Sequence, residues 1–598
     1  MSCKSFSRAS SIYGIAALAA VLCVAACGPR APKRAIERLA VLPFENHSAN
    51  PTLDWVGTAA AGVIANEITG AKGVQPFEVP AARDAYAANA TQLLQGYVAQ
   101  IGDRIHIVAS LMDPQQRKTI RVLRAEGKPG GAILPLIETV VHQISDDARP
   151  FPTRSEAALK EYFLALSSSG MEDRRKHLKL ASAADPNFGA AHVGYIQTLA
   201  AAGDVNGAKA ALAAAVAKAS SFSALDRARL NAFQANVNND PAAKVTALAE
   251  LARLQPADLE IWKSLAEARM RVRDFPGAVQ AFETLLKMAP ADAILWNAKA
   301  YAHAFANDLE GARKSIDEYK RLAPNEANPS DSLGEIYFYF GRFDEAERAF
   351  LEAHQKNAAM LGGGNLYRAA LARSLKGDTA AADAQFKKYE EFRKIAGDPL
   401  LPLETAIWEY ETNRPPAAMA RLAQFAASAP AELASLSHAQ LAVWYAAAGD
   451  ASNAKEQLQK AIQGAHTPVA QNLASVARFV TLTPAGAQEW AARALQVLPN
   501  PAQAPVRNQL LGHALLLDKK FPDAVSVWRD VYKITDPNSD GEARVMLAWA
   551  LAKSSQAGEA AKLIEKYPFP SRNPEVGLGT LTIPRLRALK AGSPQTVR

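Results

Sequence analysis

Residues that could perform catalysis are scarce in this sequence of 598 residues. No two of its ten histidines lie three to five positions apart, so no helix could present a zinc site of the H-E-x-x-H type. G-x-S-x-G, P-loop and strand-following G-x-G-x-x-G motifs are also missing from it. The glycine run 362–364 precedes an expected helix, which favours a turn over a phosphate cradle. The sequence therefore predicts no enzyme, no catalytic residue, no metal site and no cofactor.

All of the cysteines lie near the N-terminus, and the thiol of one of them, Cys27, is the remaining candidate for a chemical modification. The three cysteines are Cys3, Cys23 and Cys27. Two basic residues precede an apolar run over 12–24, which is short for a permanent membrane span but suits a secretory signal. Cleavage before Cys27 would leave a mature chain with that cysteine alone, so no disulfide could form within it.

The segment Val24-Ala25-Ala26-Cys27-Gly28 resembles the lipobox of bacterial lipoproteins. This resemblance implies a lipoprotein signal peptide over 1–26, lipidation of the Cys27 thiol, and a short tether over 27–36. Several acyl chains would hold the protein durably at a membrane. Gly28 in place of an aspartate implies the outer membrane, facing the periplasm. The alternatives are an ordinary signal peptide cut at an A-x-A-like site and a short membrane anchor.

Composition favours a mainly helical protein that does not bind nucleic acid. Hydrophobic residues make up 49% of the chain, aromatic residues make up 7%, and alanine is abundant, which favours closely packed helices. The net charge is +8, but the basic residues are interspersed with carboxylates such as Asp344, Glu345 and Glu347. A nucleic-acid binder more typically gathers its basic residues on one face.

Residues 37–147 predict a small α/β domain. The apolar run 39–44 suits a buried strand, and apolar residues at helical spacing predict a helix over 54–68. A second strand is expected over 74–79. The segments 97–101 and 104–111 flank Gly102-Asp103, a pair typical of a tight hairpin turn. A further strand over 118–124 and a helix over 132–144 complete this domain.

This order resembles the TolB N-terminal-like domain, which precedes tetratricopeptide repeats in many bacterial envelope proteins. The resemblance rests on Leu39 to Asn46 with Trp55-Val56-Gly57, on Gln95 to Val98, and on Gly102 to Ile105 with Leu111-Met112-Asp113. The short stretch from Pro80 to Thr91 departs from the family, which normally has a longer helix there. The resemblance implies a binding or assembly module rather than an enzyme.

Beyond an expected linker over 148–155, the sequence repeats with a period of 34 residues. Trp262 and Trp296 are 34 positions apart, and so are the successive alanines Ala278, Ala312 and Ala346. The period and the residue types resemble the tetratricopeptide (TPR) repeat, in which a small residue lets two helices approach. Weaker copies are marked by Gly203-Asp204, Gly377-Asp378, Gly449-Asp450, Ala524 and Ala560. We therefore expect a mainly α protein, with a TPR α-solenoid over 156–568 and a C-terminal cap or tail over 569–598.

The first helices of such repeats line a concave surface, and the family resemblance identifies which residues face it. The residues expected to bind a partner there are Lys263, Arg271, Asn297, Tyr301, Phe338, Tyr339 and Tyr367. Exposed aromatic residues would anchor an extended peptide or a partner helix. The alternative for each aromatic residue is packing between helices as part of the core.

Three functions remain open at this point. The first is a lipid-anchored envelope scaffold or adaptor that binds protein partners through the solenoid and the α/β domain. The second is a regulator of an envelope enzyme such as a peptidoglycan synthase, which would change that enzyme's rate. The third is a solute- or cargo-handling component, which would bind a small molecule saturably.

Overall fold

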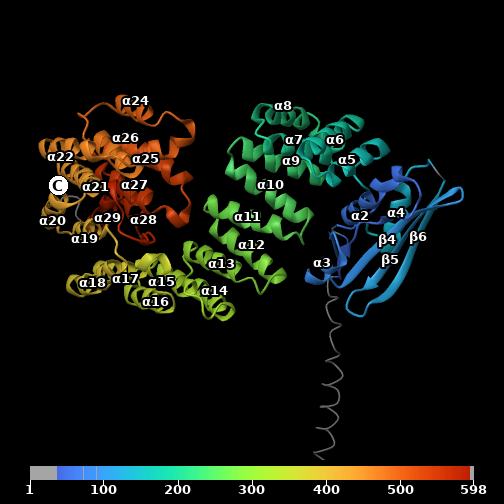
Figure 1. The fold of residues 1–598 in the computed structure, drawn as a ribbon, viewed down its shortest axis with the longest axis horizontal. Coiled ribbons are helices and arrows are strands. Elements are labelled where there is room, and N and C mark those ends of the chain that lie inside the picture. Colours follow the sequence, from blue (N-terminus) through green and yellow to red (C-terminus); the bar gives the residue numbers. More distant parts are fainter. Residues whose placement is uncertain (1–36, 70, 72, 89, 129, 593–598) are drawn as a thin grey trace, which may run out of the picture. The chain divides into compact units, whose positions relative to one another are not determined.

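The computed structural model describes residues 37–592 except 70, 72, 89 and 129. The expected signal peptide over 1–26, Cys27 and the tether over 27–36 lie outside these residues. The described chain is mainly helical with a small α/β part, which confirms the predicted fold class. It divides into two compact units, the first ending at Ile261 and the second beginning at Trp262 (Figure 1).

A mixed β-sheet begins the first unit. Its described strands are β1 (Glu37–Val41), β2 (Glu45–Asn46), β3 (Val74–Glu78), β4 (Gln92–Ile101), β5 (Arg104–Asp113) and β6 (Lys118–Gly127). The strand order is β3-β1-β4-β5-β6, with β2 beside β4. Strand β1 runs parallel to β3 and β4, whereas β4, β5 and β6 are antiparallel. The predicted hairpin is confirmed, since Gly102 at a φ of +60° turns β4 into β5.

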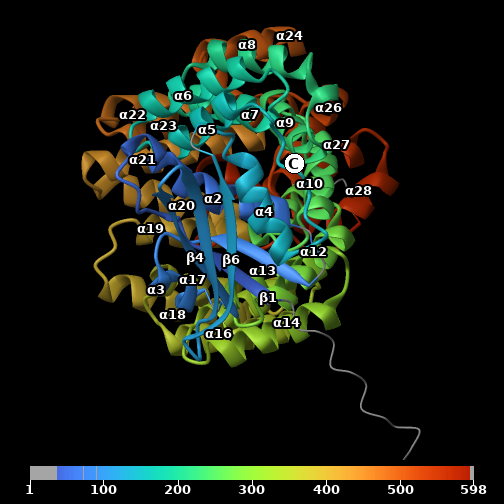
Figure 2. The same ribbon diagram turned by 90° about the vertical axis from the view of Figure 1, so that its right-hand side faces the viewer.

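Helices cover the sheet unevenly. Helices α2 (Asp54–Ile68) and α4 (Leu134–Ile144) pack on one face, where they share a core with Leu39 and Val41 (Figures 1 and 2). The short helix α3 (Ala82–Ala87) packs with Ala40 on the other face. Residues of a strand point alternately to the two faces, so β1 contributes to both cores. Ile120 and Val122 of β6 remain 47% and 45% exposed.

The segment 148–155, expected as a linker, belongs instead to the core of this unit. The Phe151 ring centroid lies 6.0 Å from that of Phe163 and 5.8 Å from that of Phe188. The Phe151 amide donates a hydrogen bond to Glu67 Oε1 over 2.9 Å. The sheet and the first helix pairs therefore share one apolar cluster, and the boundary between units falls at Ile261 rather than at this segment.

Helix pairs complete the first unit after this segment. The helices are α5 (Glu156–Ser167), α6 (Met171–Ala184), α7 (Gly189–Ala201), α8 (Val205–Val216), α9 (Ala224–Val237) and α10 (Pro241–Leu254), with η2 (Ala219–Ser221) between α8 and α9.

Glu67 makes the stability of this unit depend on pH. Burial, followed by the nearby Glu138, raises the pKa of Glu67 to about 8 from 4.5. Between these values the folded chain keeps a proton that the unfolded chain has released, so stability falls as the pH rises from about 4.5 to about 8. We expect Glu67→Gln, which retains the acceptor for the Phe151 amide, to raise the urea unfolding midpoint at about pH 8 and to change it little at about pH 5.

The matched control is Glu172→Gln, because the Glu172 side chain is 78% exposed. Equal pH dependence of the unfolding midpoint in Glu67→Gln and the unsubstituted chain would contradict the buried carboxyl group as its source.

The second unit is an array of antiparallel helix pairs. Its helices are α11 (Leu259–Arg271), which crosses the boundary, α12 (Phe275–Met288), α13 (Ala293–Phe305), α14 (Leu309–Leu322), α15 (Asn328–Tyr339), α16 (Phe343–Lys356), α17 (Gly364–Leu375), α18 (Thr379–Ile395), α19 (Leu401–Glu411), α20 (Pro415–Ser428), α21 (Ala431–Ala448), α22 (Ala451–Gly464), α23 (Pro468–Val480), α24 (Ala487–Val497), α25 (Ala504–Leu517), α26 (Phe521–Ile534), α27 (Gly541–Lys553), α28 (Ala557–Leu563) and α29 (Thr582–Lys590). Short 3-10 turns are η3 (Met360–Gly363), η4 (Pro501–Gln503), η5 (Pro537–Ser539) and η6 (Gly577–Leu581).

The packing of these pairs explains the repeated residues. Ala278, Ala312 and Ala346 are fully buried, as expected for small residues at a close helix contact. A Cβ at Gly334 of α15 would lie only 2.5 Å from the ring of Phe350 in α16, so this pair requires a glycine. Several turns that connect the two helices of a pair have the same conformation. In each of them a residue with positive φ precedes an aspartate that caps the second helix. Such turns are Arg273-Asp274, Asn307-Asp308, Gly377-Asp378 and Gly449-Asp450.

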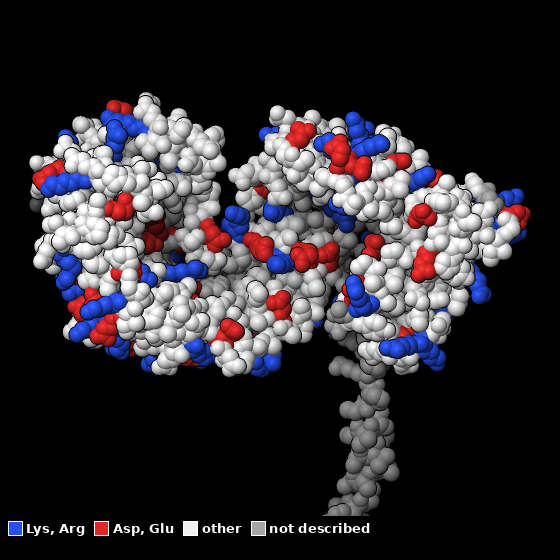
Figure 3. Space-filling model, viewed as in Figure 1, with Lys and Arg blue, Asp and Glu red and all other residues white. Residues whose placement is uncertain are grey.

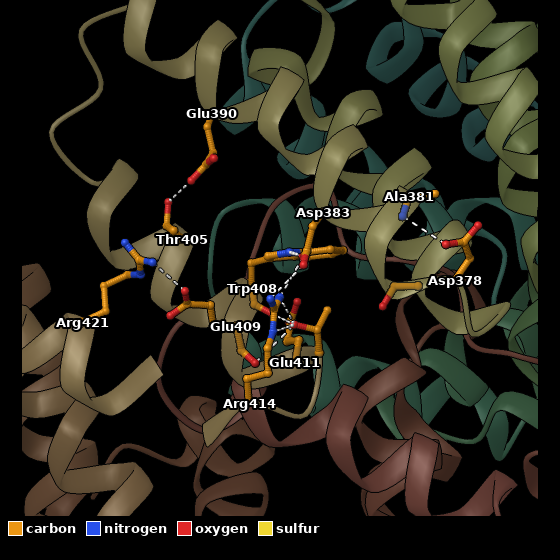
Figure 4. Close-up of polar contacts among 12 residues, drawn as sticks. Asp378, Ala381, Asp383, Glu390, Thr405, Trp408, Glu409, Glu411, Arg414 and Arg421 are labelled. Carbon is orange, nitrogen blue, oxygen red and sulfur yellow. Dashed lines mark hydrogen bonds and ion pairs between the residues drawn. The ribbon is translucent and has the colours of Figure 1, made fainter. Parts of the chain in front are cut away.

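Polar contacts fix α19 against its neighbours. Asp383 of α18 accepts hydrogen bonds from Trp408 Nε1 over 2.7 Å and from two guanidinium nitrogens of Arg414 over 2.8 Å (Figure 4). Arg414 lies at the start of α20, so one carboxylate joins three helices. These contacts fix the end of α19, where Glu411 lies.

The C-terminal region, expected as a cap or tail over 569–598, is an integral part of the second unit. A stretch over 565–576 without helix or strand connects α28 to η6 and α29. Leu581 and Leu586 belong to the same apolar cluster as Trp444. Trp444 Nε1 donates a hydrogen bond to Thr580 Oγ1 over 3.0 Å. The described residues of this region therefore complete the core of the helix array.

Candidate binding cavity

The residues expected to bind a partner fall into two groups in the structure. Lys263 and Arg271 of α11 are exposed, and Asn297 and Tyr301 of α13 are partly buried. The other three are core residues, since Phe338, Tyr339 and Tyr367 are 1%, 8% and 1% exposed. The expectation of an open aromatic groove is therefore corrected for these three, and the alternative of core packing describes them.

The chain's own C-terminal region covers these aromatic residues. We call residues 566–573 the tail segment. Its Phe569 ring lies with its centroid 5.5, 5.3 and 5.4 Å from those of Tyr301, Phe305 and Tyr339. The Tyr567 amide donates a hydrogen bond to the Tyr339 carbonyl over 2.9 Å. The surface of α13 and α15 that was expected to bind a partner peptide is thus already covered by a segment of the same chain.

Backbone contacts fix the tail segment farther along, at α17. A Cβ at Gly364 would lie 2.2 Å from the Arg572 carbonyl oxygen, so only glycine allows this approach. Arg368 Nε lies 3.4 Å from the Ser571 carbonyl oxygen and donates to it. The sequence contained one local signal for this segment, because Pro568 and Pro570 flank an aromatic residue and favour an extended chain. The sequence did not indicate which helices the tail segment would contact.

A cavity of about 810 Å³ remains between the helix array and the tail segment. Its wall combines apolar and acidic side chains from α11, α12, α13, α15, α17, α19, the segment at η5, α27 and the C-terminal region. The acidic members are Glu267, Glu335, Glu411, Asp536, Glu542 and Glu575, and the basic members are Arg368 and Arg572. Figure 3 shows acidic atoms in the recessed part of this unit. Carboxyl groups therefore outnumber cationic groups in the wall.

One of the two cations is already paired. Arg368 is 1% exposed, and its guanidinium nitrogens lie 2.6 Å from Asp331 Oδ1 and 2.8 Å from Glu335 Oε1. Tyr301 also donates its hydroxyl to Glu335 Oε2 over 2.5 Å. The Arg368 charge is thus fully compensated by groups of α15, and it offers little attraction to an anion in the cavity.

Glu411 is a buried carboxyl group in the wall. Burial raises its pKa to about 8, the hydrogen bond from the Tyr367 hydroxyl over 2.8 Å opposes this rise, and the nearby Glu575 adds to it. Burial likewise raises the pKa of Glu575. Glu411 is therefore largely protonated at neutral pH while the cavity is empty of cations.

Glu542 has the opposite character. Its carboxylate lies 2.8 Å from Nε2 of His513, whose pKa is lowered by burial. Burial favours the neutral form of Glu542, but the hydrogen bond from His513 lowers its pKa below the usual value. Glu542 is thus an ionised carboxylate with a neutral partner. Glu411, Glu542 and Glu575 had no motif that could have identified them in the sequence.

Two further observations concern other kinds of site. Among the described residues, no three histidine, cysteine or acidic side chains are grouped so that they could hold a metal ion. Within the same part of the chain, no helix combines the length and the apolar character needed to cross a membrane.

No family model and no curated protein matches the chain. Solved structures with partial likeness include MamA from Desulfovibrio magneticus RS-1, at 19% identity over 29% of this chain and 96% of that one, with a TM-score of 0.24. A tetratricopeptide repeat protein from Parabacteroides merdae is 14% identical over 44% and 99%, with a TM-score of 0.27. Naa15/Naa10 bound to HypK-THB is 15% identical over 69% and 68%, with a TM-score of 0.30. The helix-pair architecture of the second unit follows from the packing of its successive helices on one another.

Proposed function

We propose that the protein is a non-enzymatic scaffold of the bacterial envelope, tethered by lipid at Cys27, that holds a protein partner on its second unit. The observation that carries this proposal is the exposed surface formed by α11 and the first turn of α13. Ile294 at the start of α13 is 75% exposed, and Lys263 and Arg271 of α11 are exposed without an ion pair in the described part of the chain. The tail segment covers α15, α17 and the second half of α13, where Tyr301 and Phe305 lie, but no contact with it is formed by Ile294 or by the exposed residues of α11 among the described interactions.

Protein interfaces combine apolar side chains at their centre with polar side chains at their rim, and Ile294 with Lys263 and Arg271 offers both kinds. Each helix pair of such an array packs only against the neighbouring pairs. Side chains that point away from the array therefore remain available to bind another protein. We therefore place the partner site on α11 and the first turns of α13, not on the aromatic cluster of Tyr301, Tyr339 and Tyr367.

Photo-crosslinking in intact cells tests this proposal. A photoreactive residue at position 263 or 294 is expected to crosslink to one defined envelope protein. The matched control is position 314, because Lys314 is exposed on α14, the second helix of its pair. The same set of crosslinked proteins at 263, 294 and 314, or none at all, would count against a partner site on α11 and α13.

The lipid tether is supported by the lipobox-like sequence and has its own test. Cys27→Ser is expected to abolish incorporation of a fatty-acid label and to release the protein from the membrane fraction, because no other mature cysteine remains to be lipidated. Fractionation after labelling measures both effects. Cys23→Ser is the control, since Cys23 lies within the expected signal peptide. Membrane retention of Cys27→Ser without label would favour an uncleaved membrane anchor. Separation of inner and outer membranes would test the outer-membrane assignment.

A second candidate function is solute handling. The cavity of about 810 Å³ is large enough for a small organic molecule. Saturable binding of a small molecule to the purified soluble body, without any crosslinked protein partner, would favour this candidate over the scaffold.

A further inference from the structure

The cavity wall contains polar atoms whose hydrogen-bonding capacity is unused. Thr582 is only 8% exposed, and its Oγ1 has no partner among the described atoms. Asn297 Oδ1 is likewise buried without a partner among them. A buried acceptor without a donor is costly, so a ligand that brings N–H groups would be stabilised here.

The charges of the wall point to the same kind of ligand. Glu411 is 2% exposed, and no cationic group of the described residues lies within ion-pair distance of it. Glu542 is paired with a neutral imidazole, as described above. Arg368 is compensated by Asp331 and Glu335, which leaves Arg572 as the other cation among the lining residues. Arg585 and Arg587 lie near Glu542 and Glu411 without forming an ion pair with them among the described residues. Carboxyl groups therefore still outnumber cations around the cavity.

Apolar surface surrounds these carboxyl groups. Phe282, Phe338, Leu371, Phe569 and Ile583 all line the cavity. Aromatic faces attract cations as well as apolar groups, so this surface suits a charged group carried on an apolar stem. The exposed Glu267 and Ile294 also line the cavity, so its entrance adjoins the surface proposed for the partner.

We propose that this cavity binds an organic cation, an ammonium or guanidinium group on an apolar stem, with Glu411, Glu542 and Glu575 as its counter-charges. The inference rests on the proposed scaffold function, because the cation could be a lysine or arginine side chain of the partner. A free amine has the same chemistry, and the experiment separates the two sources.

The first measurement is calorimetric titration of the soluble body with matched probes. The free-ligand pair is 4-phenylbutylamine and 4-phenylbutanol, which differ in charge but hardly in shape. The side-chain pair is acetyl-Phe-Arg-amide and its citrulline analogue. We expect each cation to bind about tenfold or more tightly than its neutral counterpart. Tighter binding of the peptide than of the amine would identify a partner side chain as the natural ligand, and the reverse would identify a free amine.

Substitutions then locate the binding. The double variant Glu411→Gln, Glu575→Gln is expected to remove most of the preference for the charged probe while leaving the neutral probe unaffected. Glu391→Gln is the matched control, because Glu391 is exposed on α18 and does not line the cavity. Circular dichroism establishes that each variant is folded. The comparison of probes on the unsubstituted chain does not depend on any variant.

Proton release gives an independent readout. Glu411 is faced by Tyr367 of α17, by Glu575, and by Arg587 of α29. A cation bound beside Glu411 favours its ionised form, so binding should release protons and strengthen as the pH rises from about 6 to about 8. Titrations in buffers of different ionisation enthalpy measure this release.

Equal affinity for charged and neutral probes, or an unchanged preference in the double variant, would overturn the cation site. Crosslinking at positions 263 and 294 is measured separately. Equal affinity for the charged and neutral probes, together with specific crosslinks at positions 263 and 294, would refute only the proposal that the cavity binds a cation. A cation preference without any crosslinked protein would refute the scaffold while leaving the cavity site in place.

Discussion

Replacement of Arg368 with methionine is expected to lower the free energy of unfolding of the second unit by about 3–5 kcal/mol. The substitution leaves the buried Asp331 and the largely buried Glu335 without their counter-charge. Removing one partner of a buried ion pair costs more than the pair contributes, because the remaining charge has lost both water and compensation. Urea denaturation monitored by circular dichroism measures the change.

The control for this prediction removes all three charges. Arg368→Met combined with Asp331→Asn and Glu335→Gln should recover much of the lost stability, since no buried charge is then left without a partner. A loss below about 1 kcal/mol for the single variant would show that water reaches the two carboxylates.

Replacement of Phe569 with alanine should destabilise the same unit by about 3 kcal/mol, near the lower end for the truncation of a packed phenylalanine. The partly buried ring packs against Tyr301, Phe305 and Tyr339, and the alanine side chain would lose all three contacts. The lowered unfolding midpoint should be accompanied by faster proteolysis within residues 566–573, because the tail segment loses its anchor.

Ile395→Ala is the control for this second prediction, since Ile395 is 89% exposed and apolar but covers nothing. Similar small effects of Phe569→Ala and Ile395→Ala would mean that the tail segment is not part of the cooperative core. The groove over α13 and α15 would then be open to a partner peptide.

This second prediction changes how variants of the aromatic cluster should be interpreted. Tyr339 and Tyr367 pack inside the second unit, and Tyr367 donates its hydroxyl to the buried Glu411. Loss of a partner in a Tyr339→Ala or Tyr367→Ala variant would therefore report unfolding rather than a lost contact. Variants at Lys263 and Ile294 avoid this difficulty, because both residues are exposed.

Local patterns in the sequence were enough to identify most elements of the α/β part and the spacing of the strongest repeats. The predicted helix over 54–68 matches α2, and the Gly102-Asp103 hairpin lies where it was expected. The alanines spaced by 34 residues are buried at contacts within helix pairs. These features depend on neighbours a few positions apart or on one repeated contact, so periodicity and turn chemistry reveal them.

Other features depend on contacts that no local pattern encodes. Phe151 looked like part of a linker between two prolines, but it packs on Phe163 and Phe188. The candidate cavity was missed for the same reason, because its carboxyl groups come from positions as distant as Glu267 and Glu575. Arg368 bonds to a carbonyl 203 residues further along the chain. Repeat periodicity determines how each helix packs on the next, whereas the return of the tail segment depends on the summed curvature of many pairs, which arises only when all of them are packed together.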